Sequence, residues 1–208
     1  MIEVEEKEPK ERIILHAEDR FLSAGFNKVT LDELSSELGI SKKTMYKFFP
    51  SKDFLVRTIV KALMKKAEKN VTAIIISEKP VLQKLAEVMI FIGKTAGRFS
   101  KAFQTDIQRF APTLWKEVEK FRKEMILSRV ATLISDATKQ GKFRDDINGD
   151  IVLMMFLNSV QSIVNPEVLS QNSFSPKEAM YTIFHVIFEG SLTEEARREF
   201  LTYEIINL

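Results

Sequence analysis

The 208-residue chain contains no cysteine, and its only histidines are His16 and His185. Without cysteine there can be no disulfide framework, no thiolate metal site and no cysteine nucleophile, a composition compatible with a reducing cytoplasm. Neither histidine follows a glutamate by three residues, as the di-metal pattern of helical bundles requires. The sequence therefore indicates no catalytic residue, no metal site and no cofactor.

Long apolar runs are also absent. Runs such as IVLMMFL at 151–157 fall far short of the ~20 residues that a membrane-spanning helix needs. The acidic N-terminal segment, residues 1–11, lacks the apolar core of a signal peptide. We therefore expect a soluble, cytoplasmic protein with no membrane partner.

Glycine and proline are scarce, at 7 and 6 residues, whereas 45% of the residues are hydrophobic and 29% are charged. This is the composition of a globular protein with a substantial core rather than of a disordered chain. Apolar residues recur at intervals of three and four, and no segment alternates over the length of a strand. The sequence therefore predicts an all-α fold.

Capping signals place the first helix boundaries. Gly25 stands where a left-handed residue would end the first helix. Thr30 and Glu33 match a capping box, and Ser41 and Ser51 are suitable N-caps for the third and fourth helices. The predicted helices span about 10–24, 31–38, 42–49, 52–76, 81–97, 99–110, 113–140, 149–165, 176–190 and 193–205.

The net charge of +2 is distributed unevenly along the chain. Residues 1–38 hold 5 Lys or Arg and 10 Asp or Glu, a net charge of −5. Residues 39–69 hold 9 Lys or Arg and 2 Asp or Glu, a net charge of +7. Residues 70–208 hold 17 basic and 17 acidic residues, a net charge of zero. Because the basic excess is confined to one block, that block is expected to attract a polyanion.

The second and third predicted helices, with the short turn between them, have the dimensions of a helix-turn-helix. At 100° per residue, Met45 and Phe49 share one face of helix 42–49, while Lys43 and Lys47 lie on the opposite face. Tyr46 lies at the flank. This arrangement fits a recognition helix that packs on its apolar face and presents lysines to the DNA major groove.

Three lysines occupy first turns of predicted helices: Lys42, Lys43 and Lys52. The helix dipole disfavours a cation there by ~0.3–1 kcal/mol each. If these helix N-termini face DNA phosphates, the phosphates are attracted by the lysines, by the helix dipole and by the free N–H groups. The alternative is that the lysines form a solvated charged surface over an aromatic core. A charged surface alone would not require the helix caps, the glycine turn and the apolar face to occur together in this spacing.

Residues 10–56, and above all GFNKVTLDELSSELGISKKTMYKFFPSKDFL at 25–55, resemble the DNA-binding domain of the tetracycline repressor (TetR) family of bacterial regulators. Many members have glycine where this chain has Lys43, so the groove contact at that position differs. The resemblance implies phosphate contacts for Thr30, Tyr46 and Lys52, and base contacts for Lys42, Lys43, Thr44 and Lys47.

The resemblance further implies a DNA-binding domain at 1–56, with 1–9 disordered, and a helical effector-binding and dimerisation domain at 57–208. In relatives, the helices corresponding to about 149–165 and 176–190 form the dimer interface. Both are apolar over more than one face here, which calls for two packing partners, although packing within one core is the alternative. The residues expected at the interface are Met155, Phe156, Ser159, Ile163, Phe184, Ile187 and Phe188.

Aromatic residues gather on the helices that enclose a ligand pocket in relatives. Aromatic lining would imply a small apolar or aromatic effector, although each of these residues could equally belong to the core. The candidates are Phe91, Phe99, Phe103, Phe110, Trp115 and Phe121.

The sequence as a whole favours a homodimeric, ligand-responsive transcriptional regulator, usually a repressor in this family, that binds a palindromic double-stranded DNA operator. The alternative is a helical small-molecule-binding or partner-docking protein that does not bind DNA. An enzyme ranks third, because no motif supports catalysis.

Overall fold

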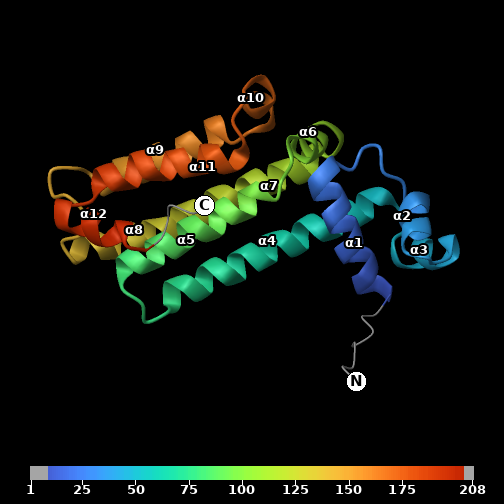
Figure 1. The fold of residues 1–208 in the computed structure, drawn as a ribbon, viewed down its shortest axis with the longest axis horizontal. Coiled ribbons are helices and arrows are strands. Elements are labelled where there is room, and N and C mark those ends of the chain that lie inside the picture. Colours follow the sequence, from blue (N-terminus) through green and yellow to red (C-terminus); the bar gives the residue numbers. More distant parts are fainter. Residues whose placement is uncertain (1–8, 204–208) are drawn as a thin grey trace.

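The computed structural model describes residues 9–203, which form an elongated bundle of helices (Figure 1). The predicted all-α fold is confirmed: within these residues there is no strand, and the only β-type pairing is a single bridge between Phe143 and Leu192. Of the segment predicted to be disordered, residues 1–8 lie outside the described residues, and Pro9 begins the first helix.

Four helices make up the N-terminal part, and their boundaries follow the predicted caps closely. The helix-turn-helix lies at one end of the molecule, and the long α4 runs from it along the bundle (Figure 1). The helices are α1 (Pro9–Ala24), α2 (Leu31–Glu37), α3 (Lys42–Phe48) and α4 (Lys52–Ile76).

The remaining helices pack along α4 and beyond it. They are α5 (Val81–Gly97), α6 (Lys101–Phe110), α7 (Pro112–Met125), α8 (Ala131–Lys139), α9 (Gly149–Ile163), α10 (Pro166–Gln171), α11 (Pro176–Phe184) and α12 (Glu194–Leu201). Two π-helical segments interrupt this series: η1 (Ile126–Val130) joins α7 to α8, and η2 (His185–Glu189) extends α11. No helix of the described part is both long and apolar enough to cross a membrane.

The short α10 was not predicted. Pro166 follows the apolar helix α9 and suggests a break, but it occupies the first turn of a new helix, where its missing N–H costs nothing. The Asn165 side chain caps that helix by accepting a hydrogen bond from the Val168 N–H at 3.0 Å.

Two apolar cores support the bundle. One is formed by α5, α8, α9, α11 and their neighbours. The other joins α1–α4 to side chains of α6 and α7, including Phe103, Ile107 and Trp115. Helices beyond residue 56 therefore pack directly on the N-terminal helices. A movement of α6 or α7 would change the packing of the helices that support the helix-turn-helix.

The capping box at the start of α2 is present as predicted. Thr30 Oγ1 accepts from the Glu33 N–H at 3.1 Å, and Glu33 Oε2 accepts from the Thr30 N–H at 2.7 Å. The hydrogen bond from the Thr30 backbone lowers the pKa of Glu33 below its ordinary value of 4.5.

This lowered pKa gives α2 a pH-dependent contribution to stability. A carboxylate with a depressed folded-state pKa stabilises the fold above its unfolded pKa, and the stabilisation is lost as pH falls through the folded pKa. We expect the Tm advantage of the wild type over Glu33→Gln to shrink between about pH 5 and pH 3. Thermal melts in matched buffers measure it, with exposed Glu68→Gln on α4 as the control; an advantage that grows on acidification would contradict the cap.

Candidate DNA-binding and ligand-binding sites

The turn between α2 and α3 is built by local backbone geometry. Gly39 adopts a left-handed φ of 64°, and the Ile40 N–H donates to the Ser35 carbonyl at 3.0 Å to close the turn. Ser41 then caps α3 by accepting from the Thr44 N–H at 3.1 Å. These contacts fix the direction in which α3 leaves the turn.

The inner face of α3 is anchored in the N-terminal core. Met45 and Phe49 are fully buried, as is Leu34 of α2, and Leu38 packs against the same cluster. The predicted apolar face of the recognition helix is therefore confirmed: α3 packs on α2 through buried apolar side chains.

The outer face of α3 is polar and exposed. Lys43, Lys47 and Tyr46 are all exposed, and within the described residues neither lysine pairs with a carboxylate. Thr44 is half-buried, and its hydroxyl shares a hydrogen bond of 2.9 Å with that of Ser41. Thr30 is exposed at the start of α2. The positions predicted to contact DNA thus include two lysines that can reach an anion without breaking an ion pair.

Lys42 and Lys52 differ from this pattern. Lys42 Nζ lies 2.5 Å from Asp32 Oδ2, an ion pair whose hydrogen bond raises the pKa of Lys42 and lowers that of Asp32. Lys52 Nζ donates to the carbonyls of Phe26 and Asn27 at 3.0 and 2.8 Å. Contacts inside the protein therefore offset the unfavourable dipole at both positions, so phosphate binding is not required to explain these two lysines.

The turn at residues 25–27, between α1 and α2, is also held from α6. Asp106 Oδ2 accepts from the N–H groups of Phe26 and Asn27, both at 2.7 Å. Gly25, with φ of 82°, allows the close approach, since a Cβ there would lie 2.5 Å from Asp106 Oδ2. Sequence reasoning missed Asp106 because nothing local marks an acidic residue of α6 as the partner of a turn 80 residues earlier.

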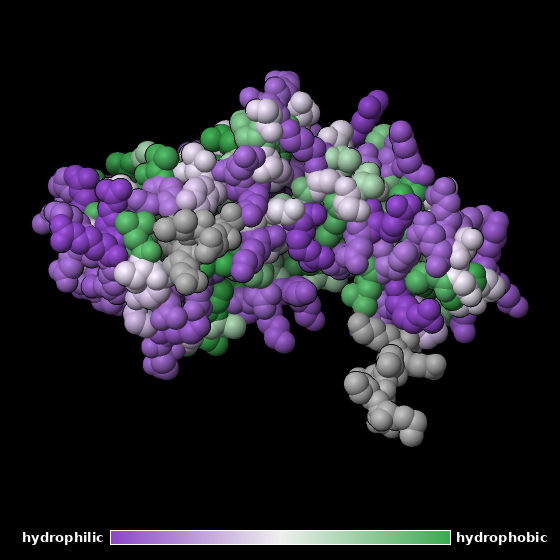
Figure 2. Space-filling view, viewed as in Figure 1, coloured by the Kyte–Doolittle hydropathy of each residue, from purple (hydrophilic) through white to green (hydrophobic). Residues whose placement is uncertain are grey.

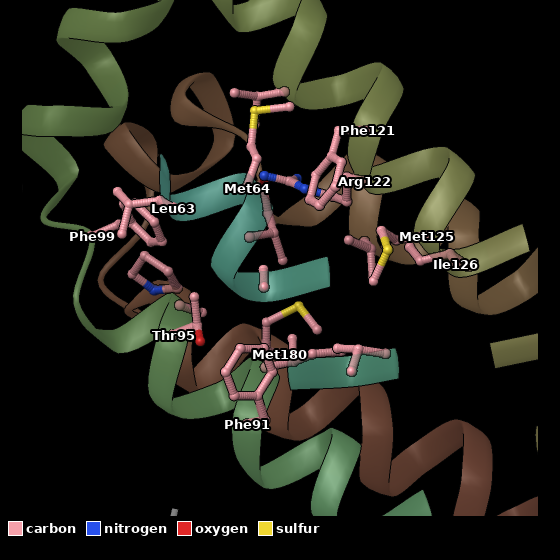
Figure 3. A pocket seen from close by; sticks show the side chains of 18 of the residues that line it. Leu63, Met64, Phe91, Thr95, Phe99, Phe121, Arg122, Met125, Ile126 and Met180 are labelled. Carbon is pink, nitrogen blue, oxygen red and sulfur yellow. The ribbon is translucent and has the colours of Figure 1, made fainter. Parts of the chain in front are cut away.

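A cavity of about 230 Å³ lies among α4, α5, α6, α7, α9 and α11. Figure 3 shows its wall, to which α5 contributes Phe91, the loop between α5 and α6 contributes Phe99, and α7 contributes Phe121. Phe103 and Trp115 also line it, so five of the six predicted aromatic residues meet at one cavity. Phe110 does not: it ends α6 and is 46% exposed, because α6 turns that residue away from the bundle.

Besides the hydroxyl of Thr95, three larger polar side chains interrupt this apolar wall: Gln104, Arg122 and Arg129. Buried Gln104 donates to the Phe99 carbonyl at 3.3 Å. Sequence reasoning missed all three. A spacing of seven residues puts Trp115, Arg122 and Arg129 on one helical face, and this signal could have identified the arginines.

The residues predicted at a dimer interface fall into two groups. Phe156, Phe184, Ile187 and Phe188 are buried in the protomer's own core, where the Phe156 ring lies 4.8 Å from that of Phe184. These four side chains therefore contribute to the core of the protomer and present almost no surface to a second copy. Met155 is exposed, and Ser159 and Ile163 are half-buried.

An exposed apolar face is nevertheless present on the same helices. Ile151, Met154 and Met155 of α9 are 57%, 59% and 53% exposed, and Val186 beside α11 is 71% exposed. Apolar surface is visible along the edge of the molecule where α9 lies (Figure 2). Sequence reasoning missed Ile151, Met154 and Val186 as interface candidates, because the apolar pattern covers both faces and does not show which is outward.

Comparison with known proteins identifies a family match over the helix-turn-helix. Residues 13–59 match the family of bacterial regulatory proteins of the tetR type. The chain is 26% identical over 169 residues to the uncharacterized HTH-type transcriptional regulator YvaF of Bacillus subtilis (strain 168), covering 80% of this chain and 87% of that protein.

Two solved structures share the fold along nearly the whole chain. One is a TetR-family transcriptional regulator from Marinobacter aquaeolei VT8, with a TM-score of 0.69 and 15% identity, covering 94% of this chain and 97% of that one. The other is the ketosteroid transcriptional regulator KstR2 of Mycobacterium tuberculosis, with a TM-score of 0.62, 15% identity and coverage of 90% and 97%. The family match identifies a tetR-type DNA-binding domain at residues 13–59, and the relative and the shared fold show that the chain as a whole is similar to TetR-family transcriptional regulators.

Proposed function

We propose that the protein is a cytoplasmic repressor that binds a palindromic double-stranded DNA operator as a homodimer and releases it when a small molecule enters the cavity. The observation that carries this proposal is the position of α6. This helix contributes Phe103, Gln104 and Ile107 to the cavity wall, and its Asp106 holds the turn that leads into α2.

In this proposal, residues 1–56 form the DNA-binding domain, and residues 57–208 form the domain that binds the effector and dimerises. The exposed apolar face of α9, with Val186, would pair with the same face of a second copy. A two-fold dimer places two recognition helices on half-sites about 34–36 Å apart. Lys43 and Lys47 would then contact DNA in each half-site.

Release follows from the same arrangement. A ligand that displaces α5 or α6 moves Asp106, and with it the turn at 25–27 and the support of α2 and α3. A change of a few Å in the spacing of the recognition helices prevents both half-sites from being engaged together. The ligand acts only to the extent that it binds the released state more tightly.

The test is DNA binding by the double variant Lys43→Ala/Lys47→Ala. We expect duplex DNA flanking the protein's own gene to bind the wild type with a strong salt dependence and the variant at least ~10-fold more weakly, with a shallower salt slope. The control is Lys65→Ala/Lys66→Ala, which removes the same charge from exposed positions of α4. Fluorescence anisotropy across a salt series gives both affinity and slope.

Two results would contradict the proposal. If the Lys43→Ala/Lys47→Ala variant binds duplex DNA as tightly as the wild type, α3 does not read the major groove through these lysines. A wild type that binds no duplex DNA in a salt-dependent manner would favour the alternative of a helical binding protein without a DNA target.

A further inference from the structure

The cavity contains more positive charge than an apolar ligand needs. Arg122 and Arg129 both line it, and within residues 9–203 neither lies within 4 Å of a carboxylate. The Nε atom of Arg129 is buried and has no hydrogen-bond partner in the described residues. Both arginines are half-buried, and holding a guanidinium against an apolar wall without a counter-charge is unfavourable, so an anion from outside the chain would be favoured here.

Arg122 is the better placed of the two. One of its terminal nitrogens donates to the Val164 carbonyl at the end of α9 at 2.9 Å, and its guanidinium carbon lies 5.8 Å from the centre of the Trp115 ring. A guanidinium has five N–H donors in a planar fork, so this single hydrogen bond leaves most of them free. Figure 3 shows its nitrogen atoms extending from α7 toward Met64. Burial lowers the pKa of Arg122, yet an arginine remains charged at neutral pH.

We propose that the cavity binds a small amphipathic carboxylate, with its head group paired to the free N–H donors of Arg122 and its apolar part among Phe91, Phe99 and Phe121. This inference rests on the proposed ligand response and defines the chemical class of the ligand. Arginine suits the role because two parallel N–H groups match the two oxygens of a carboxylate. Arg129, farther along the same helical face, adds positive potential.

The size of the cavity limits the ligand. At roughly 30 Å³ per water-sized group, 230 Å³ accommodates roughly eight such groups. Octanoate, with an eight-carbon chain and one carboxylate, is a suitable probe. The neutral 1-octanol and the cationic octylamine have the same chain and differ at the head group.

Binding of these three probes to the full-length protein tests the proposal. We expect octanoate to bind at least tenfold more tightly than 1-octanol, and octylamine to bind more weakly than both. Calorimetry gives the Kd values. The single tryptophan of the chain, Trp115, lines the cavity and gives an independent fluorescence signal.

Variants of Arg122 separate charge pairing from structural support. Arg122→Met is expected to weaken octanoate at least tenfold and to change 1-octanol less than twofold, whereas Arg122→Lys retains part of the octanoate affinity. Arg109→Met is the matched control, because Arg109 also stacks on an aromatic ring, that of Phe110, but lies outside the cavity. It should leave both affinities unchanged.

Several outcomes would overturn the inference. Equal affinity of the wild type for octanoate and 1-octanol does so without any variant, so the test survives if Arg122→Met fails to fold. A parallel loss of both ligands in Arg122→Met would show that the arginine only supports the cavity through Val164. DNA release by neutral aromatic compounds, with no binding of octanoate, would leave the proposed function standing and reject the carboxylate. Arg122-dependent octanoate binding without any effect on DNA would support the carboxylate site and reject the proposed release of DNA by a ligand.

Discussion

Phe156→Ala is expected to destabilise the protein by about 3–5 kcal/mol, the range for removing a fully buried phenylalanine. The Phe156 side chain is fully buried, and its ring centre lies 4.8 and 5.3 Å from those of Phe184 and Phe188. Truncation removes the contacts of both neighbouring rings and enlarges the adjacent cavity, which Phe156 also lines. Urea denaturation followed by circular dichroism measures the loss.

The matched control is the next residue toward the N-terminus, Met155→Ala. Met155 is 53% exposed, so within one protomer its truncation should change stability by no more than about 0.5 kcal/mol. Both variants must be compared in the same oligomeric state, because association adds to apparent stability. Sedimentation establishes that state, and Met155→Ala should weaken self-association if α9 forms the proposed interface. A Met155 variant less stable than the Phe156 variant would contradict the assignment of the two faces.

Gly25→Ala is expected to cost about 2–4 kcal/mol, since two effects add. An L-residue at a left-handed φ of 82° is strained by about 1–2 kcal/mol. The new Cβ would also lie 2.5 Å from Asp106 Oδ2 and 3.3 Å from the Ala102 backbone carbon, so Asp106 must move away from the N–H groups of Phe26 and Asn27. Intact hydrogen bonds to a charged group contribute about 1.5–3 kcal/mol each, and the flexible Asp106 side chain can shift and keep part of this contribution, so the second effect adds about 1–2 kcal/mol.

Gly39→Ala separates the two effects. Gly39 has a similar φ of 64°, but its new Cβ would meet no atom within 4 Å, so only the backbone strain remains. Chemical denaturation of both variants gives the difference, which we attribute to Asp106. Equal destabilisation of the two variants would show that the contact between α6 and the turn at 25–27 contributes nothing to stability.

The parts of the fold that could be predicted from the sequence are those determined by neighbouring residues. The starts of α2, α3 and α4 follow from Thr30, Ser41 and Ser51, since each side chain caps a backbone N–H three residues later. The π-helical segment η1 was missed within the helix predicted at 113–140, because one additional residue in a helical turn leaves the apolar pattern nearly unchanged.

The candidate sites were predictable only in part, for a different reason. The outward direction of Lys43 and Lys47 follows from helical periodicity, since α3 has one apolar face. On α9 both faces are apolar, so periodicity alone could not separate buried Phe156 from exposed Met155. Arg122 and Asp106 act through partners distant in the sequence, and their roles emerge only from the tertiary structure.

The backbone of Phe26 and Asn27 is held by side chains from two helices. Asp106 of α6 accepts from their N–H groups, while Lys52 of α4 donates to their carbonyls. These two residues thus connect α6, which lines the cavity, to the segment that leads into the helix-turn-helix. If ligand lowers operator affinity through this link, thermodynamic reciprocity requires operator DNA to lower ligand affinity by the same factor. The protein bound to the proposed operator would therefore bind ligand more weakly than the free protein, and the ligand concentration needed for a response would depend on how many operator sites are occupied.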